Sequence, residues 1–185
     1  MMSQILVSAL VSILAASTPL LLAATGELVA EKAGVLNLGV EGMMLAGAIA
    51  AFATAQGTGL TSAGLLAAVG AGMALALLFG VLTLTLHANQ TATGLALTIF
   101  GRGFSALLGA GYVGIAAPTL PKLNLPVLTD LPVLGPVLFG HDVLVYAALA
   151  MLAAVAWAIR GTHAGLVLRA VGDSHGAAHS LGYRV

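Results

Sequence analysis

The stretch Leu60–Leu86, LTSAGLLAAVGAGMALALLFGVLTLTL, runs for 27 residues without a charged side chain. A helix needs about 20 predominantly apolar residues to cross a bilayer, so this stretch is long enough to span one. The whole chain shares this character: 60% of its 185 residues are hydrophobic and 6% are charged, against about 25% charged residues in an ordinary soluble domain. We therefore expect an integral membrane protein.

Three other stretches have the length and composition of membrane-spanning helices, namely Ile5–Ala24, Thr91–Leu108 and Val143–Ile159. Pro19 interrupts the first of them, and Arg102 is the one charge well inside a span. Met43–Ala55 is also apolar, but it is too short to cross alone unless the polar run before it enters the membrane too. The segments lack the alternation over about ten residues that marks a membrane β-barrel. The sequence therefore predicts an all-α, polytopic transmembrane helical bundle in a single domain, residues 1–185.

The first apolar segment ends near Ala23 and Ala24, as the core of a cleaved signal peptide would. A signal peptide begins with a positively charged region, but no Lys or Arg precedes Lys32. We therefore interpret the segment as a retained membrane helix, with a signal peptide as the alternative.

Basic residues predict the orientation of the last span, because cytoplasmic loops carry an excess of Lys and Arg close to the membrane. Arg160, Arg169 and Arg184 follow this span, so we expect residues 160–185 to be a cytoplasmic segment. Residues 109–142 then form an extracytoplasmic connection, in which repeated proline favours extended and turn structure over a further helix. Its prolines are Pro118, Pro121, Pro126, Pro132 and Pro136. The side of the N-terminus stays open.

The stretch Gly26–Met44, GELVAEKAGVLNLGVEGMM, places four charged residues between two apolar segments and breaks the helical pattern with three glycines. The charges are Glu27, Glu31, Lys32 and Glu41, and the glycines are Gly34, Gly39 and Gly42. We expect an interrupted or short helix here. Such a break exposes backbone groups that are tolerated at membrane depth only beside a cavity or buried in protein. Transporters place breaks of this kind beside the substrate path.

A purely structural interpretation of the same stretch is also open. Asn37 is a favourable N-cap residue, and Glu41 in the first turn after it would be stabilised by the helix dipole. The charged residues at positions 27, 31 and 32 can form a solvated turn.

Small residues recur every four positions in the apolar segments, which lets helices approach closely where lipid supplies no hydrophobic drive for packing. The three ridges are Gly47/Ala51/Ala55, Ala63/Ala67/Ala71 and Gly72/Ala76/Gly80. They favour a tightly packed bundle, although this spacing also arises by chance in a chain so rich in Gly and Ala.

Sequence signatures of enzymes are missing from the chain. It contains no cysteine and no G-x-S-x-G, H-E-x-x-H or G-K-[ST] motif. His175 and His179 are spaced to share a metal, with Asp173 nearby, but a solvated helix face explains them better. A net charge of zero also gives no electrostatic footprint for nucleic acid. We predict no catalytic residue, no metal and no cofactor, and any ATP hydrolysis must come from another chain.

Three stretches resemble the membrane permeases of ABC importers, in the nucleoside and simple-sugar branch of the branched-chain amino acid/ribose-type superfamily. They are GELVAEKAGVLNLGVEGMMLAGA (26–48), NQTATGLAL (89–97) and GLVLRAVGDSHGAAHSLGY (165–183). The resemblance implies a multi-pass protein of the bacterial-type plasma membrane. It also implies partners: a second permease subunit, two cytoplasmic ATP-binding subunits and an extracytoplasmic substrate-binding protein.

The resemblance implies two sets of functional residues. The closing stretch is similar to the family's cytoplasmic coupling loop, whose short helix rests in a groove of the ATPase, with an ordinary amphipathic connector as the alternative. Its matching positions are Arg169, Ala170, Gly172, Ala177, Ala178, Leu181 and Gly182. The NLGVEG run corresponds to the interrupted helix near the translocation path. Its matching positions are Asn37, Gly39, Glu41 and Gly42, of which Asn37 and Glu41 can hydrogen-bond a polar solute.

We therefore predict the permease subunit of an ATP-driven importer, a transporter subunit and not an enzyme. Nucleosides are the expected substrate, with simple sugars and then branched-chain amino acids as alternatives. Members of the family have more membrane helices, so we expect this chain to be a truncated or incomplete permease. Two other classes remain as alternatives: an ATP-independent carrier or channel, which would need ion-coupling carboxylates inside its spans, and an intramembrane enzyme.

Overall fold

The computed structural model describes residues 2–117, 119, 139–180 and 182–183, with side chains described from Ile5 onward. Four helices in this part are long and apolar enough to cross a membrane: Ile5–Lys32, Thr61–Thr85, Gln90–Tyr112 and Val143–Gly161. They correspond one to one to the predicted spans, and the predicted all-α, polytopic bundle is confirmed. The contacts divide the chain into two compact units.

Parts of two predicted segments lie outside the described residues. The extracytoplasmic connection, predicted at 109–142, is undescribed at position 118 and over 120–138, and the cytoplasmic segment, predicted at 160–185, is undescribed at Leu181, Arg184 and Val185. The location of both segments relative to the membrane stays a prediction.

The first unit contains α1 (Met2–Lys32), α6 (Val143–Gly161), α7 (His163–Asp173) and α8 (His175–Ser180). α1 packs against α6. Thr18 and Thr25, seven residues apart on α1, are buried, and their hydroxyls donate to carbonyl oxygens four residues earlier, at 2.9 and 2.6 Å. The hydroxyl groups of these two buried threonines are thus satisfied within the helix itself.

α1 extends eight residues beyond the predicted end of its apolar segment. It contains Pro19 without ending there, which spanning helices tolerate, and it continues through Gly26 to Lys32. The predicted solvated turn at Glu27, Glu31 and Lys32 is wrong, because these residues form the last turns of the helix. Ala, Leu, Glu and Lys are strong helix formers, and the helix dipole favours a lysine in the last turn.

A sharp corner joins α6 to α7. The Thr162 hydroxyl accepts from the Gly165 amide at 3.1 Å and donates to the Ala158 carbonyl at 2.6 Å, so one side chain caps α7 and closes the end of α6. Gly165 is buried, and a Cβ atom there would overlap the carbonyl oxygen of Ala158. The corner therefore requires glycine for close packing.

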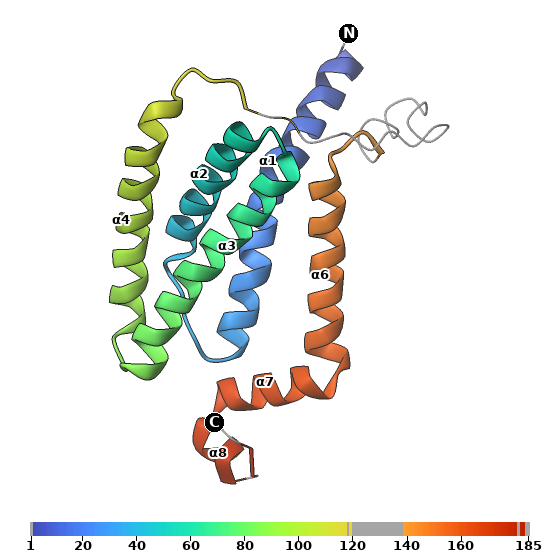
Figure 1. Ribbon diagram of the computed structural model, residues 1–185. Coiled ribbons are helices and arrows are strands. Elements are labelled where there is room, and N and C mark those ends of the chain that lie inside the picture. The colour runs from blue at the N-terminus through green and yellow to red at the C-terminus, as the bar shows by residue number, and fades with distance from the viewer. Residues whose placement is uncertain (1, 118, 120–138, 181, 184–185) are drawn as a thin grey trace. The chain divides into compact units, whose positions relative to one another are not determined.

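The second unit contains α2 (Val40–Thr58), α3 (Thr61–Gly80) with its π-helical extension η1 (Val81–Thr85), α4 (Gln90–Gly109) and the 3-10 turn η2 (Ala110–Tyr112). α2 packs against both α3 and α4 (Figure 1). It joins α3 through Gly59, whose φ of 72° lies in the left-handed region that favours glycine. With 19 residues, α2 is longer than the predicted Met43–Ala55.

The contact between α2 and α3 uses one of the three predicted small-residue ridges. A Cβ on Gly47 would lie 3.3 Å from the Ala68 carbonyl oxygen, and one on Gly64 would lie 2.7 Å from the Ala51 carbonyl oxygen. The Gly47/Ala51/Ala55 ridge therefore packs at backbone distance from α3. A Cβ on Gly72 or Gly80 would meet nothing within 4 Å, so that ridge makes no such contact with the described residues.

Candidate functional site

The segment before α2 is the interruption that the glycines predict. Residues 33–39 are not helical, and Gly34 adopts a φ of 82°. The Asn37 side-chain oxygen accepts from the Gly39 amide at 2.9 Å, an Asx-type turn that leads the chain into the helix. The predicted N-cap at Asn37 is wrong by two positions, because Gly39 is the N-cap. Glu41 does lie in the first turn of α2, as predicted.

Side chains of α4 hydrogen-bond the backbone of this break. Gln90 accepts from the Leu36 amide at 2.8 Å, and the Thr98 hydroxyl donates to the Leu38 carbonyl at 2.8 Å. Non-helical backbone at membrane depth requires such partners because lipid offers none. The break thus runs along the first half of α4. The polar segment before α2 therefore lies, together with α2, at the membrane depth that α4 crosses.

Four glycines bring the break and α4 into backbone contact. A Cβ on Gly94 would lie 2.7 Å from the Leu38 amide nitrogen, and one on Gly39 would lie 3.2 Å from the Gly94 carbonyl oxygen. One turn further, a Cβ on Gly42 would overlap the Leu97 carbonyl oxygen, and one on Gly101 would overlap the backbone of Gly42. Gly39 and Gly42 are buried in this contact, so they set the helix spacing and have no surface for a solute.

The same contact places two opposite charges side by side. Arg102 follows Gly101 and Glu41 precedes Gly42, and both Nε and Nη2 of the arginine donate to Glu41 Oε1, the former at 3.2 Å. Arg102 lies twelve residues after Gln90 and ten before Tyr112 in a span of 23 residues, or about 18 Å and 15 Å along the axis. Arg102 therefore lies near the middle of this span. Its side chain is 62% exposed and that of Glu41 is 56% exposed.

The predicted coupling residues lie on two short helices that follow α6. Arg169, Ala170 and Gly172 are half-buried on α7, whereas Ala177 is exposed on α8 and Gly182 is exposed after it. Ala178 is 1% exposed, so its methyl group packs within the unit, and Gly182 has a φ of 88°. Leu181 lies outside the described residues. The segment therefore presents some of its predicted contact positions and covers others.

Metal binding by the histidines of α8 gains no support from the geometry. Both His175 and His179 are exposed, and no group of three His, Cys, Asp or Glu side chains that could hold a metal occurs within residues 2–117, 119, 139–180 and 182–183.

Residues 9–185 match the protein family described as the permease component of the branched-chain amino acid transport system. The chain belongs to this permease family. The membership confirms the resemblance carried by its three motifs. Two of these motifs, 26–48 and 89–97, pack together at the break. With four apolar helices among the residues that the structure describes, the permease is a multi-pass protein of the plasma membrane.

Three curated relatives are similar to the permease over most of its length. A putative glucose ABC transporter permease of Haloferax volcanii is 37% identical over 174 residues, covering 92% of this chain and 53% of the relative. A guanosine ABC transporter permease of Bacillus subtilis is 33% identical over 182 residues, covering 91% and 57%. A nucleoside ABC transporter permease of Lactococcus lactis is 29% identical over 187 residues, covering 91% and 57%.

The chain thus spans little more than half the length of these relatives. No solved structure matches it.

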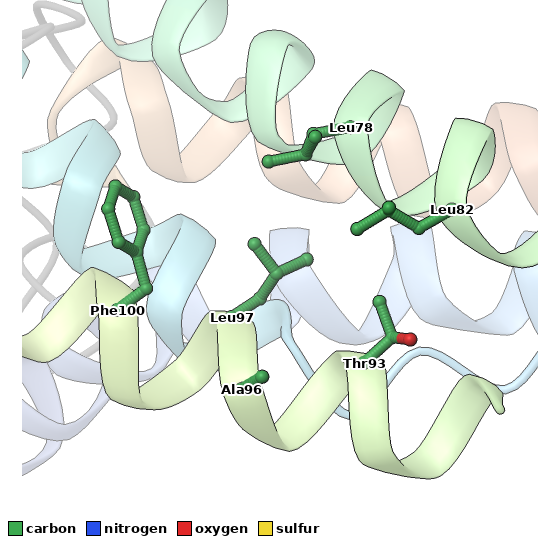
Figure 2. A pocket seen from close by; sticks show the side chains of 6 residues that line it. All are labelled: Leu78, Leu82, Thr93, Ala96, Leu97 and Phe100. Atoms are coloured by element: carbon green, nitrogen blue, oxygen red, sulfur yellow. The ribbon is translucent and has the colours of Figure 1, made fainter. Parts of the chain in front are cut away.

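The permease also has an apolar groove, whose lining does not include the charged pair. It is lined by side chains of α3, η1 and α4 (Figure 2), namely Leu78, Leu82, Thr93, Ala96, Leu97 and Phe100. Five of the six are hydrocarbon side chains and none is charged, so the groove suits an acyl chain or another apolar helix and not a polar solute.

The Glu41–Arg102 pair is the part of the site that sequence reasoning missed. The sequence singles out each residue separately, but their separation by 61 positions hides the pairing. A signal is nevertheless present: each charge adjoins a glycine, in VEG and in GRG. Two helices that meet through those glycines can bring the neighbouring charges together.

Proposed function

We propose that this chain forms part of the membrane permease of an ATP-driven importer whose substrate is a nucleoside. The observation that carries the proposal is the family match over residues 9–185, together with relatives named for guanosine and nucleoside transport. The proposed partners are a second permease subunit, two cytoplasmic ATP-binding subunits and an extracytoplasmic substrate-binding protein. ATP hydrolysis belongs to the ATP-binding subunits, since this chain carries no Walker lysine motif.

A simple sugar is the second candidate substrate, favoured by the relative from Haloferax volcanii named for glucose. Branched-chain amino acids follow, from the description of the family alone. Glucose and nucleosides share an uncharged framework that carries several hydroxyl groups, whereas amino acids are zwitterions. Glucose and nucleosides therefore belong to one chemical class, the neutral polyhydroxylated solutes, and experiments can test whether the path through the permease accepts this class.

The coupling role falls to α7, α8 and the residues just after them. Helices of 11 and 6 residues are too short to cross a bilayer. They suit a contact surface on the cytoplasmic side, where the basic residues predict them to lie. We assign the contact with the ATP-binding subunit to Arg169, Ala170, Gly172, Ala177, Ala178, Leu181 and Gly182. In the described part, Ala177 and Gly182 supply the accessible surface, while Ala178 holds α8 in place.

The translocation path is assigned to the break and its first helical turn, with Asn37, Gly39, Glu41 and Gly42. The roles differ among these four. Asn37 and the two glycines shape the break, through the turn at Gly39 and the contact with α4. Glu41 keeps a mostly exposed side chain and is the member that can reach a solute.

Uptake by the complete system tests the proposal. The full-length permease would be reconstituted in proteoliposomes with its ATP-binding subunits and binding protein, and uptake of radiolabelled guanosine, glucose and leucine would be measured with and without ATP. We expect ATP-dependent uptake of guanosine. ATP-dependent uptake of glucose alone would assign the sugar branch instead, and uptake that persists without nucleotide would contradict an ATP-driven importer.

A further inference from the structure

The charged pair at the centre of α4 needs an environment other than lipid. Arg102 lies near the middle of the Gln90–Tyr112 span, where a charged side chain facing hydrocarbon is costly and where charges face protein or a water-filled cavity. Pairing with Glu41 cancels the net charge but leaves both groups polar. Exposed fractions of 62% and 56% show that the described residues do not cover them.

The local backbone keeps the pair accessible. Arg102 is flanked by Gly101 and Gly103, and a Cβ on Gly103 would meet nothing within 4 Å. Gly42 beside Glu41 likewise has no side chain that could shield the carboxylate. Both hydrogen bonds between the two side chains end on Oε1 of Glu41. Three of the five guanidinium N–H donors and the second carboxylate oxygen therefore remain available for other hydrogen bonds at the surface formed by the described residues.

We propose that the Glu41–Arg102 pair lines the solute path and that Arg102 is a specificity-determining residue for neutral polyhydroxylated solutes, an inference that rests on the proposed importer function. The free guanidinium N–H groups donate to hydroxyl or carbonyl oxygens of the solute, and Glu41 Oε2 accepts from its hydroxyl or N–H groups. Bonds to charged groups are stronger than neutral ones. Because the pair is neutral overall, it offers these bonds without attracting anions or cations.

The break supports this role by fixing the position of Glu41. The contacts of Gly42 with Leu97 and Gly101 and the hydrogen bond from Thr98 to Leu38 hold the first turn of α2 against the middle of α4. The two charges therefore start from a preorganised geometry, and a solute does not have to order them.

Neutralising both charges distinguishes two roles of the pair, contact with the solute and a purely structural ion pair. Arg102→Gln and Glu41→Gln each leave one unpaired charge in the span, whereas the double variant removes both charges and keeps two amides at the same place. A structural role predicts that the double variant recovers the uptake that the single variants lose. Our proposal predicts that uptake of guanosine or glucose stays reduced about 10-fold or more in the double variant, since charge-assisted hydrogen bonds to the solute are gone. Copurification with the ATP-binding subunits should be normal.

Cysteine labelling tests directly whether water reaches the pair. The 185 residues contain no cysteine, so Ala106→Cys introduces a single thiol into this part of the permease. Ala106 lies one turn after Arg102 on the same side of α4 and is exposed, and this variant leaves the pair intact. Leu107→Cys is the matched control, because Leu107 is 77% exposed but lies about 140° round the helix from Arg102.

We expect a charged, membrane-impermeant thiol reagent, applied from each side in turn, to label Ala106→Cys and not Leu107→Cys. An excess of transported solute should slow the labelling. Resistance of Ala106→Cys in both nucleotide-free and ATP-bound complexes would overturn the proposal, and would assign the pair to a contact with another part of the assembly. Full uptake by the double neutral variant would overturn it too. Failure of the wild-type complex to show ATP-dependent uptake would instead contradict the importer function itself.

Discussion

The break beside α4 and the coupling segment are both rich in glycine and alanine, but the small residues serve different purposes in the two regions. At the break, Gly42, Gly94 and Gly101 lie where any side chain would meet the backbone of the facing segment. In the coupling segment, a Cβ on Gly176 or Gly182 would meet nothing within 4 Å, and the φ of Gly182 is positive. The first region is specified by packing inside the chain, whereas the second is shaped to present a surface. Substitutions should therefore affect stability in one and assembly in the other.

Gly101→Ala is the substitution expected to have the largest effect on stability. Its Cβ would overlap the backbone of Gly42, which cannot yield without separating α2 from α4. Overpacking costs about 1–3 kcal/mol and occasionally more, and a backbone contact lies at the upper end of this range. The melting temperature of the detergent-solubilised protein, followed by fluorescence-detected gel filtration, should fall clearly. Gly103→Ala, two residues away in open space, is the control and should melt at the wild-type temperature or above it. Equal melting temperatures for the two variants would refute the packing argument.

Gly165→Ala tests the exception within the C-terminal region. The added Cβ would overlap the Ala158 carbonyl oxygen at the α6–α7 corner, but α7 is a short terminal helix that can shift. We expect a loss toward the lower end of the same range of about 1–3 kcal/mol. The measurement is again the melting temperature, together with copurification of the ATP-binding subunits, since a displaced α7 would move the coupling surface. Gly176→Ala is the open-space control, and a Gly165→Ala protein indistinguishable from it would show that the corner tolerates a side chain.

Thr98→Val should have a smaller effect, because it removes one hydrogen bond and leaves the packing intact. The hydroxyl that donates to Leu38 would be lost, leaving that carbonyl of the break without its partner on α4. Hydrogen bonds between membrane helices contribute on average about 0.6 kcal/mol, so a fall of only a few degrees is expected. Thr98→Ser keeps the donor and should behave as wild type. A Ser variant as unstable as the Val variant would point to the methyl group instead of the hydrogen bond.

The sequence predicts the position of the break and of the spans better than it predicts the end of α1 and the contacts that the break makes. The glycines predict an interruption before α2, and hydropathy predicts all four spans. The end of α1 is placed too early, because Gly26 and the glutamates near it suggest a turn while their neighbours favour helix. Contacts such as Thr98 with Leu38, 60 residues apart, leave no periodic trace in one sequence. The same holds for the small-residue ridges: spacing alone does not tell Gly47, which packs on α3, from Gly72, where a Cβ would meet nothing within 4 Å.

For the coupling segment, the sequence predicts the residues and the structure adds which of them are accessible. The motif matches at Ala177 and Ala178 equally, but Ala178 is 1% exposed whereas Ala177 faces outward on α8. Burial of one alanine and exposure of its neighbour follow from the direction in which α8 turns against α7, and no local pattern in six residues determines it. A substitution meant to disturb only the proposed contact must therefore avoid Ala178, where a large side chain would also unfold α8.

Ala177→Trp is accordingly the substitution expected to change stability least. Its side chain would extend from the exposed face of α8 without displacing any described neighbour. The free energy of unfolding should therefore stay within about 0.5 kcal/mol of the wild-type value, and the melting temperature should hardly change. The bulky indole should nevertheless prevent the close approach of an ATP-binding subunit, and copurification of that subunit should be largely lost. Ala164→Trp, exposed on α7 outside the proposed contact, is the control and should retain the subunit. Normal copurification of Ala177→Trp would remove α8 from the interface, and a large fall in melting temperature would show that this region, like the break, is specified by packing within the chain.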